Sequence, residues 1–234
     1  MTETTWLSSP SPQEMLQFLA DRGFVSERKL RLFAVACCRL IWELILDAKS
    51  REAIEVAERF ADGLASEREI ARLSGGRYRL ATSLTRCLSS ATAAVGWAVA
   101  HPITASETQL CCRHVADATF YHLVDSGNYR KTRHHFEQMM DGFSAARNRE
   151  QADYIRDIFP TPFHPVSFDS SWRTETVVSL TRSMYESRDF SAMPLLADAL
   201  MDADCNEAEV LEHCRGNDPH VRGCFVVDFC LGLL

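Results

Sequence analysis

SERKLRLFAVACCRLIWELI, residues 26–45, is the stretch that decides the fold of this chain. Its apolar residues return every three or four positions, which is the spacing that places side chains on one face of an α-helix. The residues of this stripe are Leu30, Phe33, Ala34, Cys37, Cys38, Ile41, Leu44 and Ile45. A helix of about 20 residues is roughly 30 Å long. The stretch therefore predicts a long central helix in the core.

Signals for the beginning and the end of further helices surround this stretch. Ser11 and Thr174 are typical N-cap residues in front of apolar helical patterns. Ser66 with Glu69 has the spacing of a capping box, and Gly63 is placed to end the helix before it. Alternating apolar and polar runs, which would indicate strands, are nearly absent. The sequence predicts an all-α fold, an irregular multi-helix bundle of about nine or ten helices.

The chain is predicted to divide into three segments that together form one integrated unit. Residues 1–127 form an N-terminal helical bundle. Residues 128–172 comprise a polar surface segment, a short helix up to Ile158 and an extended, proline-rich connector at 159–172. Residues 173–234 form a C-terminal helical subdomain packed on the bundle. The connector is expected to lie against the core because it carries four aromatic residues, Phe159, Phe163, Phe168 and Trp172.

Composition and charge narrow the classes of function. Apolar residues make up 46% of the chain and charged residues 24%, which is typical of a globular protein with a sizeable core. The formal net charge of −7 argues against a general binder of nucleic acid or of anionic membranes, because these ligands require a basic surface. No apolar run is long enough to cross a membrane, and the first residues do not resemble a secretory signal. We expect a cytoplasmic protein.

The cysteines also indicate a reducing compartment. The chain has nine of them, and two pairs are adjacent in sequence, Cys37-Cys38 and Cys111-Cys112. An odd number with adjacent pairs is a poor disulfide framework. Reduced, buried thiols in a cytosolic protein explain the pattern better.

Three segments of the sequence resemble an uncharacterised family of planctomycete bacteria, relatives of Gemmata among them. They are SERKLRLFAVACCRLIW with AIEVAERFADGLAS, then YIRDIFPTPFHPVSFDSSW, and finally PLLADALMDADCNEAEVLEHCRGNDPHVRGCFVVDFCLG. Members of that family end in an HCRxxxxHVRGCWVVD-like motif, and the chain departs from the family pattern at Phe225, where Trp is usual, and at Thr161, where Asn is usual. The resemblance implies a shared helical fold and no particular activity.

EHCRGNDPHVRGC, residues 212–224, gathers the metal-binding residue types most densely. If a helix begins at Asp218-Pro219, His220 and Cys224 lie one turn apart on the same face. With the thiols on either side of the preceding helix, Cys205, Cys214, His220 and Cys224 could in principle surround a tetrahedral zinc ion, with His213 as a substitute ligand. The segment lacks the C-x₂-C knuckle that strong zinc motifs carry.

Two other interpretations of residues 212–224 remain open. In the first, the segment is a tight helix-turn-helix in which Cys214 and Cys224 fill a core and His220 is a structural hydrogen-bonding group. In the second, a thiol and His220 form a Cys–His nucleophilic dyad, which requires an exposed and activated thiolate. Sequence motifs for nucleotide binding, metalloproteases and serine hydrolases are absent, so we assign no catalytic and no cofactor-binding residue.

These observations favour a non-enzymatic, cytoplasmic helical module that acts through contact with another protein. Phe163, His164 and Trp172, in the aromatic connector, are the expected anchors for this unidentified partner. The alternative is a zinc- or thiol-dependent enzyme, or a zinc-stabilised domain, centred on residues 205–224. No cofactor is expected, and zinc is the one that the pattern would allow.

Overall fold

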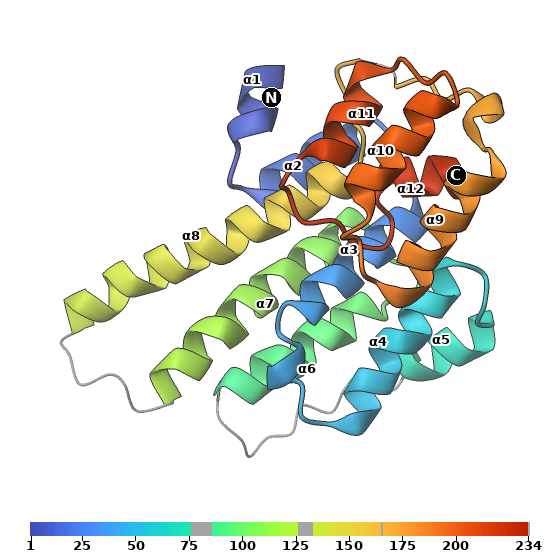
Figure 1. Ribbon diagram of the computed structural model, residues 1–234. Coiled ribbons are helices and arrows are strands. Elements are labelled where there is room, and N and C mark those ends of the chain that lie inside the picture. The colour runs from blue at the N-terminus through green and yellow to red at the C-terminus, as the bar shows by residue number, and fades with distance from the viewer. Residues whose placement is uncertain (76–85, 126–132, 165, 234) are drawn as a thin grey trace. The chain divides into compact units, whose positions relative to one another are not determined.

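A computed structural model describes residues 1–75, 86–125, 133–164 and 166–233 (Figure 1). These residues contain twelve α-helices, two 3-10 helices and no strand, which confirms the predicted all-α class. None of these helices combines the length and the apolar character needed to cross a membrane. The α-helices are α1 (Glu3–Ser8), α2 (Pro12–Asp21), α3 (Glu27–Arg39), α4 (Ala48–Ala61), α5 (Glu67–Gly75), α6 (Arg86–Ala98), α7 (Ala105–Asp125), α8 (Arg133–Ile158), α9 (Glu175–Ser187), α10 (Met193–Asp202), α11 (Ala208–Arg215) and α12 (Phe225–Leu231).

The chain forms two compact units, Met1–Ile155 and Arg156–Leu234. We call them unit 1 and unit 2 and describe each by itself. The division falls inside the segment 128–172, which the sequence predicts to connect two halves. Helix α8 contributes most of its length to unit 1 and its last residues to unit 2.

Helix α3 is the centre of unit 1, where it packs against α4, α6 and α7 (Figure 1). The side chain of Ser26 caps it by accepting a hydrogen bond from the backbone N–H of Lys29. Its apolar stripe is buried as predicted, but the predicted length is wrong. The α-helix ends at Arg39, and a 3-10 helix, η1 (Trp42–Leu44), follows. Arg51 donates hydrogen bonds to the carbonyls of Trp42 and Ile45, so these carbonyls have a partner without a further helical turn.

Cysteines contribute to the α3–α7 contact. Cys38 Sγ lies 3.7 Å from Cys111 Sγ, and Cys37 is hydrogen-bonded to Cys112. Eight of the nine cysteines, all those whose side chains the structure describes, are buried free thiols. Burial raises the pKa of Cys37 well above its usual range. These thiols act as small apolar side chains that let the two helices approach closely.

Helix α8 differs from the prediction of a polar surface segment that ends in a short helix. It is one continuous helix of 26 residues, Arg133–Ile158. The prediction depended on apolar periodicity, which is weak here. The segment is nevertheless rich in Glu, Gln, Met, Ala and Arg, which have high helix propensity, and it contains no proline. Propensity was therefore the better signal in this stretch.

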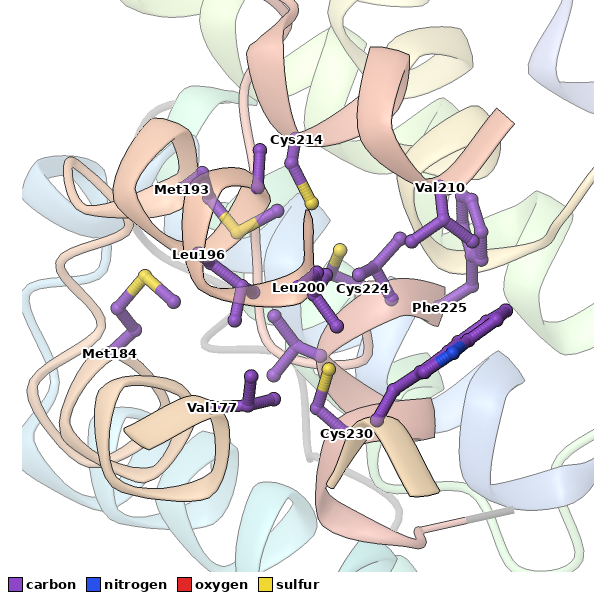
Figure 2. Packing of buried hydrophobic residues seen from close by; sticks show 14 of the residues in the cluster. Val177, Met184, Met193, Leu196, Leu200, Val210, Cys214, Cys224, Phe225 and Cys230 are labelled. Atoms are coloured by element: carbon purple, nitrogen blue, oxygen red, sulfur yellow. The ribbon is translucent and has the colours of Figure 1, made fainter. Parts of the chain in front are cut away.

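Unit 2 has its own apolar core, to which α9, α10, α11 and α12 all contribute (Figure 2). The side chain of Thr174 caps α9, as predicted. The connector after α8 is not helical until η2 (Ser170–Trp172), and it is docked through its aromatic rings. The ring of Phe168 lies 5.2 Å from that of Trp172 and 5.5 Å from that of Phe229. The labelled core residues in Figure 2 are Val177, Met184, Met193, Leu196, Leu200, Val210, Cys214, Cys224, Phe225 and Cys230.

Candidate metal centre

Four side chains of metal-binding type converge in unit 2: Asp157, His213, His220 and Cys224. One potential ligand atom from each lies within 4.8 Å of the corresponding atoms of the other three. Asp157 comes from the last turn of α8 and His213 from α11, while His220 and Cys224 belong to the loop between α11 and α12. It is the only such group of three or more residues in the part of the chain that the structure describes.

Asp157 is at the centre of this group and is 1% exposed. Its Oδ1 atom lies 2.7 Å from His220 Nδ1 and 3.1 Å from His213 Nε2, and its Oδ2 atom accepts the backbone N–H of Val221 at 2.8 Å. Burial by itself would raise the pKa of Asp157, but the hydrogen bonds and positive charge of the two histidines more than offset it. The net effect lowers that pKa, so Asp157 is a buried carboxylate with its negative charge retained.

Cys224 is the fourth member of the group and is fully buried. Its Sγ atom lies 3.3 Å from His213 Nε2 and 4.0 Å from His220 Nδ1. Burial, together with the nearby negative charge of Asp157, raises the pKa of this thiol well above its usual range. An isolated thiol in this environment is protonated and is a poor nucleophile.

The loop between α11 and α12 is held in place from two directions. Asp157 binds the backbone N–H of Val221, and Arg222 donates to the carbonyl of Tyr185 at 2.7 Å and to that of Glu186 at 3.3 Å. Gly223 has a φ of +95°, a backbone conformation that favours glycine. These contacts fix the positions of His220 and Cys224 on either side of Val221.

The loop corrects one prediction. No helix begins at Asp218-Pro219, and the next helix, α12, starts at Phe225. The N–H of Val221 donates to a carboxylate instead of a helical carbonyl, and the left-handed conformation of Gly223 interrupts the helical path. His220 and Cys224 are neighbours nonetheless, through the shape of the loop and not through one turn of helix.

The structure brings together two of the four predicted zinc ligands, His220 and Cys224, along with the substitute His213. Cys205 and Cys214 lie in the apolar core of unit 2 and are not members of the group. Asp157, which is 56 residues from His213 along the chain, was not among the predicted ligands. An acidic residue between Ile155 and Ile158, in YIRDIFP, was the available signal, because a charge within an apolar run needs a buried partner.

The geometry does not support the Cys–His dyad. In a catalytic relay the imidazole uses one ring nitrogen for the nucleophile and the other for the carboxylate that orients it. Here His220, the histidine of the predicted dyad, faces both Asp157 Oδ1 and Cys224 Sγ with the same ring nitrogen, Nδ1, at 2.7 Å and 4.0 Å. The buried thiol also lacks the exposure that a nucleophile needs. A carboxylate, two imidazoles and a thiol gathered within 4.8 Å of one another are the residue types of a metal-ligand set.

The predicted anchors of a protein partner have different environments. His164 is exposed, Phe163 is half-buried, and Trp172 is 8% exposed in the core of unit 2. Trp172 is therefore occupied by contacts within the unit. A docking surface at the connector stays a prediction.

Comparisons with known proteins give no relative for this chain. No protein-family model, no curated protein and no solved structure matches it. The resemblance to the planctomycete family therefore stays a prediction, and the functional argument depends on the geometry of the site.

Proposed function

We propose that unit 2 is a metal-stabilised, non-enzymatic helical module in which Asp157, His213, His220 and Cys224 bind one transition-metal ion. The observation that supports this most is the convergence of a carboxylate, two imidazoles and a thiol within 4.8 Å at a buried point. Carboxylate oxygen, imidazole nitrogen and thiolate sulfur are all common protein ligands of first-row transition metals.

A bound ion would stabilise the fold of a unit as small as unit 2. Domains of this size have small apolar cores, and many depend on disulfides or metals for stability. The described cysteines of unit 2 are free thiols, so no disulfide strengthens it there. An ion at this site would join the end of α8, helix α11 and the following loop. Structural zinc in small domains contributes about 10–16 kcal/mol of apparent binding free energy at neutral pH.

The buried polar groups favour the same interpretation. Taking a carboxylate and two imidazoles out of water is costly even when they are hydrogen-bonded. A bound cation would compensate the charge of Asp157 directly and would stabilise the thiolate form of Cys224. Free thiols throughout the described chain also support a cytoplasmic location, as the sequence predicts.

The first experiment measures the metal content of the full-length protein and of two matched variants. Cys224→Ala removes the proposed sulfur ligand, while Cys214→Ala removes an equally buried thiol of the same core outside the group. We expect one equivalent of metal in the wild type and in Cys214→Ala, and its loss in Cys224→Ala.

A second measurement keeps the proposal testable if a variant does not fold. A strong chelator should lower the melting temperature of the wild-type protein, and adding the ion back should restore it. A metal-free wild-type protein whose melting temperature is unaffected by added divalent ions would overturn the proposal and leave a purely hydrogen-bonded cluster.

A further inference from the structure

Resting on the proposed function, we infer that the ion is zinc and that all four side chains bind it, so that no coordination position is left for water or a substrate. The site would then be closed. This inference specifies both the identity of the ion and the chemistry of the site, neither of which follows from metal binding alone.

The donor set selects among ions. Two imidazole nitrogens and one sulfur disfavour magnesium and calcium, which require oxygen ligands. A single sulfur with nitrogen and oxygen ligands is also a poor site for Cu(I), which prefers several soft ligands. Zinc accepts all three donor types in tetrahedral geometry, and a Cys-His-His-Asp set is within its ordinary range.

The distances between donor atoms fit a tetrahedral ion. Zinc binds nitrogen and oxygen at about 2.0–2.2 Å and sulfur at about 2.3 Å, so two ligand atoms of a tetrahedral site are about 3.3–3.7 Å apart. The observed separations are 2.7 Å and 3.1 Å from Asp157 Oδ1 to the two histidines, and 3.3 Å and 4.0 Å from Cys224 Sγ to them. The 2.7 Å separation would have to lengthen by about 0.6 Å and the other three to change by about 0.3 Å or less, while the two remaining pairs lie within 4.8 Å.

The second oxygen of Asp157 explains why the coordination number stops at four. Oδ2 accepts the backbone N–H of Val221 at 2.8 Å, so the carboxylate offers the ion only Oδ1. A carboxylate bound through one oxygen, with the other held by a backbone donor, is a typical outer-shell arrangement that orients a metal ligand.

Burial excludes water as a fifth ligand or as a replacement for one of the four. The side chains of Asp157 and His220 are 1% and 6% exposed, Cys224 is buried, and His213, the most exposed of the four, has a side-chain exposure of 15%. Catalytic zinc sites keep three protein ligands and one accessible position, whereas structural sites use four protein ligands. The burial of this group matches the structural kind.

Cobalt(II) is the probe, because it replaces zinc and reports coordination number in its visible spectrum. We expect the full-length wild-type protein to bind one Co(II) with the intense visible bands of a four-coordinate ion and a near-ultraviolet sulfur-to-cobalt band. Azide should leave these bands unchanged, and one equivalent of zinc should displace the cobalt. Asp157→Asn should weaken cobalt binding by at least about tenfold, whereas Asp198→Asn, at an exposed carboxylate of the same unit, should not.

Each result decides between the two claims. Weak bands of a six-coordinate ion, a spectrum that shifts with azide, or cobalt that zinc does not displace would overturn the closed zinc site while leaving metal binding intact. Failure of the wild type to bind cobalt or zinc would overturn the proposed function itself.

Discussion

Both units bury charged side chains, and two of these, Arg31 in unit 1 and Asp157 in unit 2, are satisfied in different ways. Arg31 is fully buried on α3, donates to the carbonyls of Ala98 and Ala100, and pairs with Glu27 one turn away. Its partners are mainly backbone groups, which cannot move independently of the fold. Asp157 instead faces three side chains that can all bind metal.

This difference distinguishes a buried charge with a purely structural role from one that belongs to a candidate metal site. Backbone carbonyls that accept from a guanidinium give it a structural role, since carbonyls of the fold are its partners. Imidazoles and a thiol around a carboxylate satisfy its lone pairs equally well, but the same atoms also form a ligand set. Burial and hydrogen bonding alone therefore do not identify function, and the chemical type of the partners does.

The largest effect on stability is expected from replacing Arg31. Arg31→Met should lower the free energy of unfolding of the protein by about 3 kcal/mol, because it leaves two carbonyls and Glu27 without their donor. Urea unfolding should give the same loss of stability in the presence of a chelator and in the presence of added zinc. A loss that depends on metal would remove the distinction between the two buried charges.

An intermediate effect, on metal affinity, is expected at Arg222 of unit 2. Its guanidinium donates to two carbonyls at the end of α9 and lies 4.8 Å from the centre of the Tyr185 ring. Arg222→Ala should release the loop that carries His220 and Cys224 and weaken metal affinity by about 10–100-fold. Competition with a chromogenic chelator measures this affinity.

Arg215→Ala is the matched control for Arg222. Arg215 belongs to the same unit, but it pairs with Asp198 at the surface. Equal metal affinities of Arg222→Ala and the wild type would show that the loop does not depend on this anchor.

The smallest effects are expected at one N-cap in each unit, Asp47 of α4 and Thr174 of α9. Replacing either by Ala should cost about 1 kcal/mol. A hydrogen bond from Ser50 is the main reason that the pKa of Asp47 is lowered. The contribution of Asp47 is therefore complete above the pKa of an unfolded aspartate, about 3.9, and is lost as the pH falls through the lower folded-state value.

The free energy of unfolding of both cap variants, measured across a pH series, tests the direction of this pH dependence. The difference between Asp47→Ala and the wild type should shrink as the pH is lowered below about 4, while the difference for Thr174→Ala stays constant. A cap contribution of Asp47 that grows toward low pH would contradict the lowered pKa.

Local patterns predicted the elements whose signals lie within a few residues. The stripe at 26–45 is buried almost throughout, and Ser26 and Thr174 cap the helices that follow them. Two predicted helix bounds failed where a side chain paired with backbone groups that a helix would otherwise use. Arg51 donates to the carbonyls of Trp42 and Ile45 at the 3-10 helix η1, and Asp157, from a distant segment, accepts the N–H of Val221 where a helix was expected.

The sequence by itself determined that the chain is helical, because apolar periodicity and capping act between residues at most one or two turns apart. It also identified His220 and Cys224 as candidate ligands, with His213 as a substitute ligand. Only the tertiary structure brought Asp157 to them and kept Cys205 and Cys214 apart from them in the apolar core. A ligand set depends on distances in space between segments far apart in the chain, and those distances follow from packing rather than from spacing along the sequence.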